Sequence, residues 1–227
     1  MNHFSPHLEI LLPPQIALWK ELSDVPRQFV LYGGTALALH LGHRNSVDFD
    51  FFGSRTLDLS QIERDIPFLK GANIIQRETN TLSAIVDRDG PVKVSFFGVP
   101  NLRRLSSPVI AGDNGLPVAS LLDLAGTKAS VVQMRAEAKD YIDLDALITA
   151  GKVDLSTALS AAQQIYGQTF NPQITLKALS YFDDGDLRQL PEDLKSRLAT
   201  AARQVDLDRL PSIEKTHQYD QEHGYDL

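Results

Sequence analysis

The chain has 227 residues, 43% of them hydrophobic, no cysteine and a formal net charge of −7. This length and apolar content allow one large domain or two small ones, with a core that needs no covalent staple. The lack of cysteine excludes disulfides and thiolate metal sites, so any metal must be held by oxygen or histidine. The negative charge argues against a protein that coats nucleic acid through a general basic surface, although a local basic groove stays allowed.

The sequence carries no signal of a membrane or secreted protein. No apolar run approaches the roughly 20 residues that a membrane-spanning helix needs. The start, MNHFSPHLEI, lacks a basic segment followed by an apolar one. We therefore expect a cytoplasmic protein with no membrane partner. Acidic residues concentrate in the C-terminal half, so an anionic substrate is expected to bind the N-terminal half.

The first 41 residues predict a helix, a strand and a second helix. Apolar residues at helical spacing over 13–25 predict a helix that packs on the core. The apolar run 29–32 predicts a short strand, Gly33-Gly34 a tight turn, and residues 36–41 a helix.

The glycine turn is a candidate anion site. Gly33, Gly34 and Thr35 lie where a helix begins, so backbone N–H groups and about half a positive charge of the helix dipole face the turn. The alternative is a plain tight turn between strand and helix. The acidic strand that follows favours the anion site, because it brings a cation site close to it.

Two acids lie in the next apolar strand, predicted over 47–52. Alternate side chains of a strand share a face, so Asp48 and Asp50 point the same way, with Cα atoms about 6.6 Å apart. This spacing suits joint binding of divalent cations, since paired catalytic metals lie roughly 3.5–4 Å apart. A merely solvated polar face is the alternative. It fits poorly, because inward-facing carboxylates on so apolar a strand repel each other unless cations compensate.

The rest of the N-terminal half predicts a mixed sheet. A capping box that begins at Ser60 predicts a helix over 60–69. Three β-rich runs follow, at 73–79, 82–87 and 92–97, the last two joined by a hairpin signal. A loop rich in proline and glycine, 100–117, ends this half.

From residue 118 onward the chain predicts helices. Signals that start a helix stand at Ser120, Asp154, Asn171-Pro172 and Pro191. The domain organisation that we expect is a sheet domain over 1–117, a helical domain over 118–211 and a flexible polar tail over 212–227.

The segment 123–145 carries cations at regular spacing. If it is one continuous helix, Arg135 lies about 20° from Lys128 around the axis and Lys139 about 40° from Arg135. The three would then form a stripe that faces other protein. The alternative is a set of surface ion pairs, such as Lys139 with Asp143. A helix break inside the segment would remove this phase relation.

Other common site motifs are missing from the sequence. No Walker-type lysine follows the glycines, and no nucleophile elbow is present. Four histidines show no metal-ligand spacing and are expected at the surface or in packing; they are His40, His43, His217 and His223.

Taken together, three segments resemble the AbiEii/AbiGii type of nucleotidyltransferase toxin, within the DNA polymerase β superfamily. They are GGTALALHLGHRNSVDFDFF, VKVSFF and DLAGTKASVVQMRAEAKDYIDL, and a looser likeness extends the match to about 29–205. The resemblance implies an α+β fold, in which a polymerase-β-like mixed α/β sheet flanked by helices precedes a helical part. It also implies the toxin of a toxin–antitoxin or phage abortive-infection pair.

The resemblance also implies roles for single residues. The metal-binding acids are Asp48 and Asp50, which would hold Mg²⁺ or Mn²⁺. The nucleotide-binding residues are Gly33, Gly34, Thr35, Arg44 and Ser46. The catalytic residues are Asp48, Asp50, Lys128, Arg135, Lys139 and Asp140. The substrate would be an NTP, and the partners an acceptor and a cognate antitoxin.

One position departs from the wider superfamily, which usually has a third carboxylate on a neighbouring strand. Ser95 stands where we expect that acid, and serine is no base at physiological pH. The third acid could come from Asp87, Asp140 or Asp143. Otherwise the acceptor is deprotonated with less help, or the chain only binds nucleotide.

The sequence leaves three functions open. The first is transfer of a nucleoside monophosphate from an NTP to a hydroxyl of tRNA or protein, with release of pyrophosphate. The second is a catalytically impaired module on the same fold that binds nucleotide or a partner. The third is a phosphotransferase that moves the terminal phosphate and releases ADP.

Overall fold

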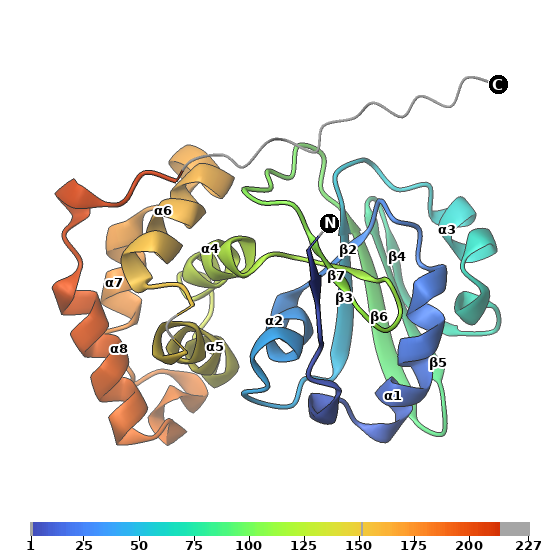
Figure 1. Cartoon of the computed structure of the whole chain (residues 1–227), viewed down its shortest axis with the longest axis horizontal. Helices are drawn as coiled ribbons and strands as arrows, with labels where there is room; N and C mark the ends of the chain where they lie inside the picture. The colour runs from blue at the N-terminus through green and yellow to red at the C-terminus, as the bar shows by residue number, and fades with distance from the viewer. Residues whose placement is uncertain (1, 151, 214–227) are drawn as a thin grey trace.

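The computed structural model describes residues 2–150 and 152–213, which form one mixed sheet and a set of helices (Figure 1). The strands are β1 (His3–Phe4), β2 (Val30–Tyr32), β3 (Asp48–Gly53), β4 (Asn73–Glu78), β5 (Thr81–Asp87), β6 (Pro91–Gly98), β7 (Val109–Ala111) and β8 (Pro117–Val118). The α-helices are α1 (Pro13–Trp19), α2 (Gly33–Leu41), α3 (Leu59–Asp65), α4 (Leu121–Val131), α5 (Ala138–Thr149), α6 (Leu155–Tyr166), α7 (Pro172–Ala178) and α8 (Glu192–Gln204).

The strand order is β1-β7-β8-β2-β3-β6-β5-β4. The pairs β1 with β7, β2 with β8 and β3 with β6 are parallel, and the other neighbours are antiparallel. A mixed sheet with flanking helices and a helical C-terminal part confirms the predicted fold class. The acidic strand β3 lies inside the sheet, between β2 and β6.

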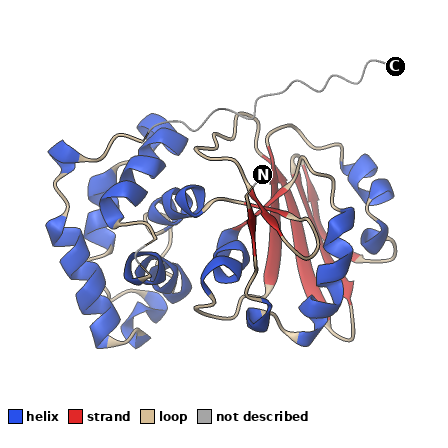
Figure 2. Cartoon of the chain, in the orientation of Figure 1, coloured by secondary structure: helices blue, strands red, loops and turns tan. Residues whose placement is uncertain are grey.

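The two faces of the sheet have different neighbours. The Phe49 ring lies 6.2 Å from Trp19 of α1, and the Phe51 ring stacks on Phe96 at 5.2 Å. Helices α1 and α3 lie on one side of the sheet, and α2 with the C-terminal helices on the other (Figures 1 and 2). Because side chains alternate along β3, Asp48 and Asp50 point away from α1, towards α2 and the C-terminal helices.

The predicted strands are all present, but three short ones escaped prediction. Strands β7 and β8 lie in or at the end of the segment that we expected to be a loop, and β1 precedes the first helix. Each of the three has only two or three residues. Such short segments cannot display the alternation that identifies a strand.

The predicted start of α3 was wrong. Asp58, and not Ser60, is the residue before the first turn, and its carboxylate accepts the Gln61 N–H at 2.9 Å. The Ser60 hydroxyl instead accepts a hydrogen bond from Arg77 at 3.2 Å. Asp58 and Ser60 are both suitable capping residues. Ser60 contacts Arg77 of β4 instead, and Asp58 caps the helix.

Replacing the two candidate caps one at a time should distinguish them. Asp58→Ala is expected to lower the free energy of unfolding by about 1 kcal/mol, because the Gln61 N–H in the first turn of α3 loses its acceptor. Ser60→Ala should lower the free energy of unfolding by only a few tenths of this amount, since the hydrogen bond between Ser60 and Arg77 is exposed. Urea unfolding of both variants measures the difference. Equal losses would show that the Asp58 cap is not what starts α3.

One hydrophobic cluster includes buried side chains of both the sheet and the C-terminal helices. Helix α2 connects them, because it contacts β2 and β3 on one side and α4 and α5 on the other. The predicted boundary between 1–117 and 118–211 stays a prediction. Of the predicted tail, 214–227 lies outside the described residues, as do His217 and His223. In the part of the chain that the structure describes, no helix is long and apolar enough to cross a membrane.

Candidate active site

The acid pair lies on one face of β3, as predicted. In the sheet, Asp50 is in register with Tyr32 on β2 and with Ser95 on β6. Asp48 is in register with Lys93, also on β6. Phe49 and Phe51, on the other face, are fully buried, whereas both acids are half-buried.

The electrostatics of the acid pair favour a bound cation. Burial raises the pKa of Asp50, and the neighbouring carboxylate of Asp48 raises it further. The positive charge of Lys93, a hydrogen bond from Ser95 and the charge of Lys128 oppose this shift but do not cancel it. Two partly desolvated carboxylates on one face therefore repel each other, and a divalent cation would relieve the repulsion.

The donor set of this pair fits a magnesium ion. Carboxylate oxygens are the ligands that Mg²⁺ prefers, and the ion usually binds through one or two of them, with waters and phosphate oxygens completing the octahedron. Within residues 2–150 and 152–213, no group of three or more histidine, cysteine or acidic side chains is placed to hold a metal. The pair therefore suits a metal that arrives with a phosphate substrate better than a metal held by protein alone.

The glycine turn packs directly against these acids. Gly33 has a φ of +76°, and a Cβ there would lie 3.1 Å from Asp50 Oδ2. A Cβ on Gly34 would lie 2.4 Å from Arg44 Nη2 and 3.2 Å from Ser46 Oγ. Only glycine therefore lets the turn approach both the acid and the arginine this closely.

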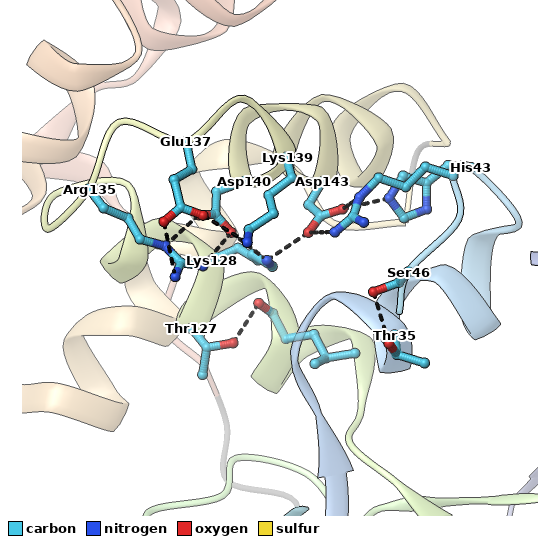
Figure 3. Close-up of polar contacts among 12 residues, drawn as sticks. Thr35, His43, Ser46, Thr127, Lys128, Arg135, Glu137, Lys139, Asp140 and Asp143 are labelled. Carbon is cyan, nitrogen blue, oxygen red and sulfur yellow. Dashed lines mark hydrogen bonds and ion pairs between the residues drawn. The ribbon is translucent and has the colours of Figure 1, made fainter. Parts of the chain in front are cut away.

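The start of α2 leaves its N–H groups without a side-chain cap. The residue before the helix is Tyr32, whose side chain makes no capping hydrogen bond. The buried Thr35 hydroxyl donates to the Asp48 carbonyl and lies 2.8 Å from Ser46 Oγ (Figure 3). Thr35 and Ser46 thus hold the turn against β3, while the first backbone N–H groups of the helix stay available to an anion.

The segment 123–145 is not one continuous helix, so the condition on which the cation stripe depended is not met. Helix α4 ends at Val131 and α5 begins at Ala138. Met134, in the connection, is 81% exposed, so no buried side chain anchors a continuous helix there. The N-terminus of α5 is instead satisfied from a distance, because Asp186 accepts the Ala138 N–H at 2.8 Å.

Two of the three predicted cations nevertheless converge on Asp140. Lys128 Nζ lies 2.6 Å from one of its oxygens and Arg135 Nε 2.8 Å from the other (Figure 3). Lys139 points elsewhere, with its Nζ 2.8 Å from Glu137 and its side chain 53% exposed. The pair predicted between Lys139 and Asp143 is replaced by contacts of Asp143 with other cations.

Asp143 is the centre of a second set of ion pairs. Arg44 binds its two oxygens with Nε at 2.7 Å and Nη2 at 2.8 Å. His43 Nε2 lies at 2.7 Å and Lys128 Nζ at 2.6 Å (Figure 3). Burial acts to raise the pKa of Asp143, but His43, Arg44 and Lys128 hold it well below the usual range.

We refer to these side chains as the charged cluster: His43, Arg44, Lys128, Arg135, Asp140 and Asp143. Both of its acids have no exposed side-chain area, and Lys128 has 7%. The cluster joins α4 and α5 to the loop before β3. It also lies near the acid pair, because Lys128 lowers the pKa of Asp50.

Sequence reasoning missed two residues of this region. His43 was expected at the surface or in packing, but its ring nitrogen pairs with Asp143 across 100 residues of sequence. No local pattern could reveal that contact. Lys93 could have been found, because it alternates with Ser95 along a predicted strand and so shares a face with it.

Ser95 lies where we expected a third carboxylate, in register with Asp50. Its hydroxyl is 3.1 Å from Ser83 Oγ. The three acids named as substitutes are all engaged elsewhere. Asp87 accepts the Gly90 N–H in the β5–β6 hairpin, and Asp140 and Asp143 bind the cations of the charged cluster.

Comparisons with known proteins bear on the family and the fold. The family model of the nucleotidyl transferase AbiEii toxin of type IV toxin–antitoxin systems matches residues 17–219. An uncharacterised protein of Aquifex aeolicus (strain VF5) is 33% identical over 171 residues, which are 74% of this chain and 81% of that protein.

Two solved structures share the fold. The nucleotidyltransferase toxin MenT4 of Mycobacterium tuberculosis H37Rv has a TM-score of 0.58 at 16% identity, covering 86% of this chain and 83% of its own. JHP933 of Helicobacter pylori has a TM-score of 0.52 at 20% identity, and the match covers 87% of this chain and 89% of the JHP933 chain. With the family match over most of its length, this chain belongs to the AbiEii nucleotidyltransferase toxin family.

Proposed function

We propose that the chain transfers a nucleoside monophosphate from an NTP to a hydroxyl of tRNA or protein, in a reaction that needs Mg²⁺ or Mn²⁺. One observation carries the proposal: the acid pair Asp48 and Asp50 faces a glycine turn whose helix N-terminus is uncapped. A cation site and a phosphate site thus adjoin. Membership of the family supplies the reaction class and implies an NTP substrate and an antitoxin.

The acid pair and the turn would hold the triphosphate. A divalent ion bound by Asp48 and Asp50 would neutralise phosphate charge and polarise the phosphorus centre. The N–H groups from Gly33 to Thr35 would donate to phosphate oxygens. Ser46 and Arg44 stay in the proposed nucleotide-binding set, because both lie against Gly34.

The charged cluster, together with Lys139, would stabilise the negative charge that develops on the leaving pyrophosphate. Arg135 keeps 45% of its side chain exposed and Lys139 53%, so both can reach a substrate. Lys128 is buried and shared between Asp140 and Asp143, so it would act as a fixed charge. Donors held in place before the reaction need no rearrangement in the transition state, which makes them effective. Asp140 would keep Lys128 and Arg135 oriented.

A second candidate function is a module that binds nucleotide without transferring it. Ser95 favours this alternative, because it occupies the expected place of a third carboxylate beside Asp50. The acids that could replace it are already paired with cations or with a backbone N–H. In an active enzyme, the acceptor hydroxyl would therefore lose its proton with less help from the protein.

Incubation with labelled NTPs, Mg²⁺ and either cell RNA or cell protein tests the proposal. We expect label on one acceptor class, release of pyrophosphate, and no transfer after chelation of the metal. Release of ADP would indicate phosphate transfer instead. Binding of NTP with no labelled acceptor would favour the binding module. Co-expression with the product of the adjacent gene tests whether a cognate antitoxin suppresses the activity.

Gly34→Ala should weaken NTP binding about tenfold. The new Cβ would lie 2.4 Å from Arg44 Nη2, and Arg44 cannot move away easily because Asp143 holds its guanidinium at two points. Gly112→Ala is the matched control, since Gly112, like Gly34, has no left-handed φ and its Cβ would meet only the Phe4 carbonyl oxygen, at 3.3 Å. Calorimetry with NTP and Mg²⁺ measures both affinities. Unchanged NTP affinity in Gly34→Ala would exclude the turn from the binding site.

A further inference from the structure

A row of aromatic side chains continues the acid face of the sheet. Phe52 follows Asp50 by two residues on β3, and Phe97 follows Ser95 by two on β6. The Phe52 and Phe97 rings are 4.9 Å apart, and the Tyr32 ring lies 5.2 Å from Phe52. We call Tyr32, Phe52 and Phe97 the aromatic row. It begins about 6.6 Å from the acids along the strand.

The aromatic row differs from the aromatic residues on the opposite face. There, Phe49, Phe51 and Phe96 have no exposed area at all. In the aromatic row Tyr32 is buried, but Phe52 and Phe97 are only half-buried. The β2 end of the aromatic row is therefore closed to solvent, whereas the rings on β3 and β6 are partly exposed. A flat ligand could stack on these exposed rings.

An arginine lies over the closed end of the row. Arg104 Nη2 donates to the Phe52 carbonyl at 3.2 Å, and the Arg104 guanidinium lies close enough to the Tyr32 hydroxyl to oppose the rise in the Tyr32 pKa. Its Nε is buried and has no hydrogen-bond partner among the described residues. A buried guanidinium N–H without an acceptor is costly, so the chain alone does not satisfy Arg104.

The loop that carries Arg104 joins β6 to β7 and contacts the C-terminal helices, because Asp123 of α4 accepts the Leu105 N–H at 2.8 Å. It follows β6 and runs towards the end of α6 (Figure 1). Arg103 Nη1 donates to the Gln164 carbonyl there at 3.5 Å. Tyr166, the last residue of α6, is 36% exposed and close enough to affect the pKa of Tyr32. Arg104 and the further aromatic ring of Tyr166 thus lie near Tyr32, at the β2 end of the aromatic row.

We propose that the aromatic row and Arg104 form a nucleobase-binding subsite of the transfer site. The inference rests on the proposed function and names the part of the substrate that this surface recognises. A base would stack on Phe52 and Phe97, and Arg104 would donate to its ring nitrogen or carbonyl oxygens. The spacing along β3 leaves about the length of a ribose between the stacked base and a phosphate held at the acids.

The base could belong to the NTP or to an RNA acceptor, and the test separates the two. Phe97→Leu and Arg104→Gln are compared with wild type for binding of NTP with Mg²⁺, of inorganic tripolyphosphate with Mg²⁺, and of a short single-stranded RNA. If the base of the NTP binds here, NTP affinity falls about tenfold in both variants and tripolyphosphate affinity is unchanged. If an acceptor base binds here, RNA affinity falls and both phosphate ligands bind as in wild type.

Phe4→Leu is the matched control, because Phe4 is also partly buried but stacks on His40 at 4.5 Å, outside the aromatic row. Unchanged affinity for both NTP and RNA in Phe97→Leu and Arg104→Gln would overturn the inference. So would an equal loss of tripolyphosphate and NTP binding, which would mean a general distortion. Failure of wild type to bind either NTP or tripolyphosphate would instead count against the proposed function.

Discussion

Asp50→Asn is expected to reduce transfer by about a thousandfold or more, because losing a metal ligand removes several kcal/mol of transition-state stabilisation. Asn keeps the size of the side chain, so the turn at Gly33 keeps its close contact. Steady-state transfer with labelled NTP at saturating Mg²⁺ measures the loss. Asp65→Asn on α3, which lies on the other side of the sheet, should retain wild-type activity (Figure 1).

The same substitution should leave the metal-free protein at least as stable as wild type. The pKa of Asp50 is raised in the folded state by burial and by Asp48. The folded chain therefore binds a proton more tightly than the unfolded chain, and ionisation of Asp50 at neutral pH lowers stability. Asn removes this cost.

With Mg²⁺ present, wild type should become more stable than Asp50→Asn. Wild type is expected to gain thermal stability from Mg²⁺, because an ion bound only by the folded state stabilises it by mass action. Asp50→Asn should gain little. A variant that is inactive and also strongly destabilised without metal would contradict the assignment of Asp50 as a metal ligand, and would point to a structural role.

Local patterns in the sequence predicted half of this site. The alternation along β3 placed both acids on one face, and the glycine pair placed a helix N-terminus beside them. The helix starts at Ser120, Asp154 and Asn171 are also confirmed, since each side chain accepts an N–H two or three residues later. Such contacts depend only on neighbouring residues, so a sequence displays them.

The other half depends on contacts between distant residues. Arg44 and Asp143 are 99 residues apart, and the N–H of Ala138 is capped by Asp186, 48 residues later. The break between α4 and α5 follows from such contacts and not from local propensity. The cation stripe depended on an unbroken helix and is therefore not formed, although Lys128 and Arg135 both bind Asp140.

These long-range ion pairs suggest how the two parts of the site stay in register. Arg44 lies against Gly34 of the turn and is held by Asp143 of α5. Asp143 also binds Lys128 of α4. A single buried carboxylate thus connects the proposed phosphate site with both helices that carry the cations.

Asp143→Asn should lower the free energy of unfolding by about 3–5 kcal/mol, which is the usual cost of removing one partner from a buried ion pair. His43, Arg44 and Lys128 would then face one another with no full negative charge from residue 143. For a chain of this size the melting temperature should fall by about 10 °C. Asp193→Asn is the matched control, because Asp193 pairs with Arg197 at the surface and is 71% exposed. It should cost less than about 1 kcal/mol.

The pH dependence of this loss identifies its cause. Burial alone would raise the pKa of Asp143, but the three cations around it hold it well below the usual range. The ionised carboxylate therefore contributes stability above about pH 4, where an unfolded aspartate is charged, and this contribution is lost as the pH falls towards the folded pKa. Urea unfolding at pH 7 and at pH 3 should show a large difference between Asp143→Asn and wild type at pH 7 and a smaller one at pH 3. A difference that is equal at both values would mean that Asp143 stabilises the protein by packing and not by its charge.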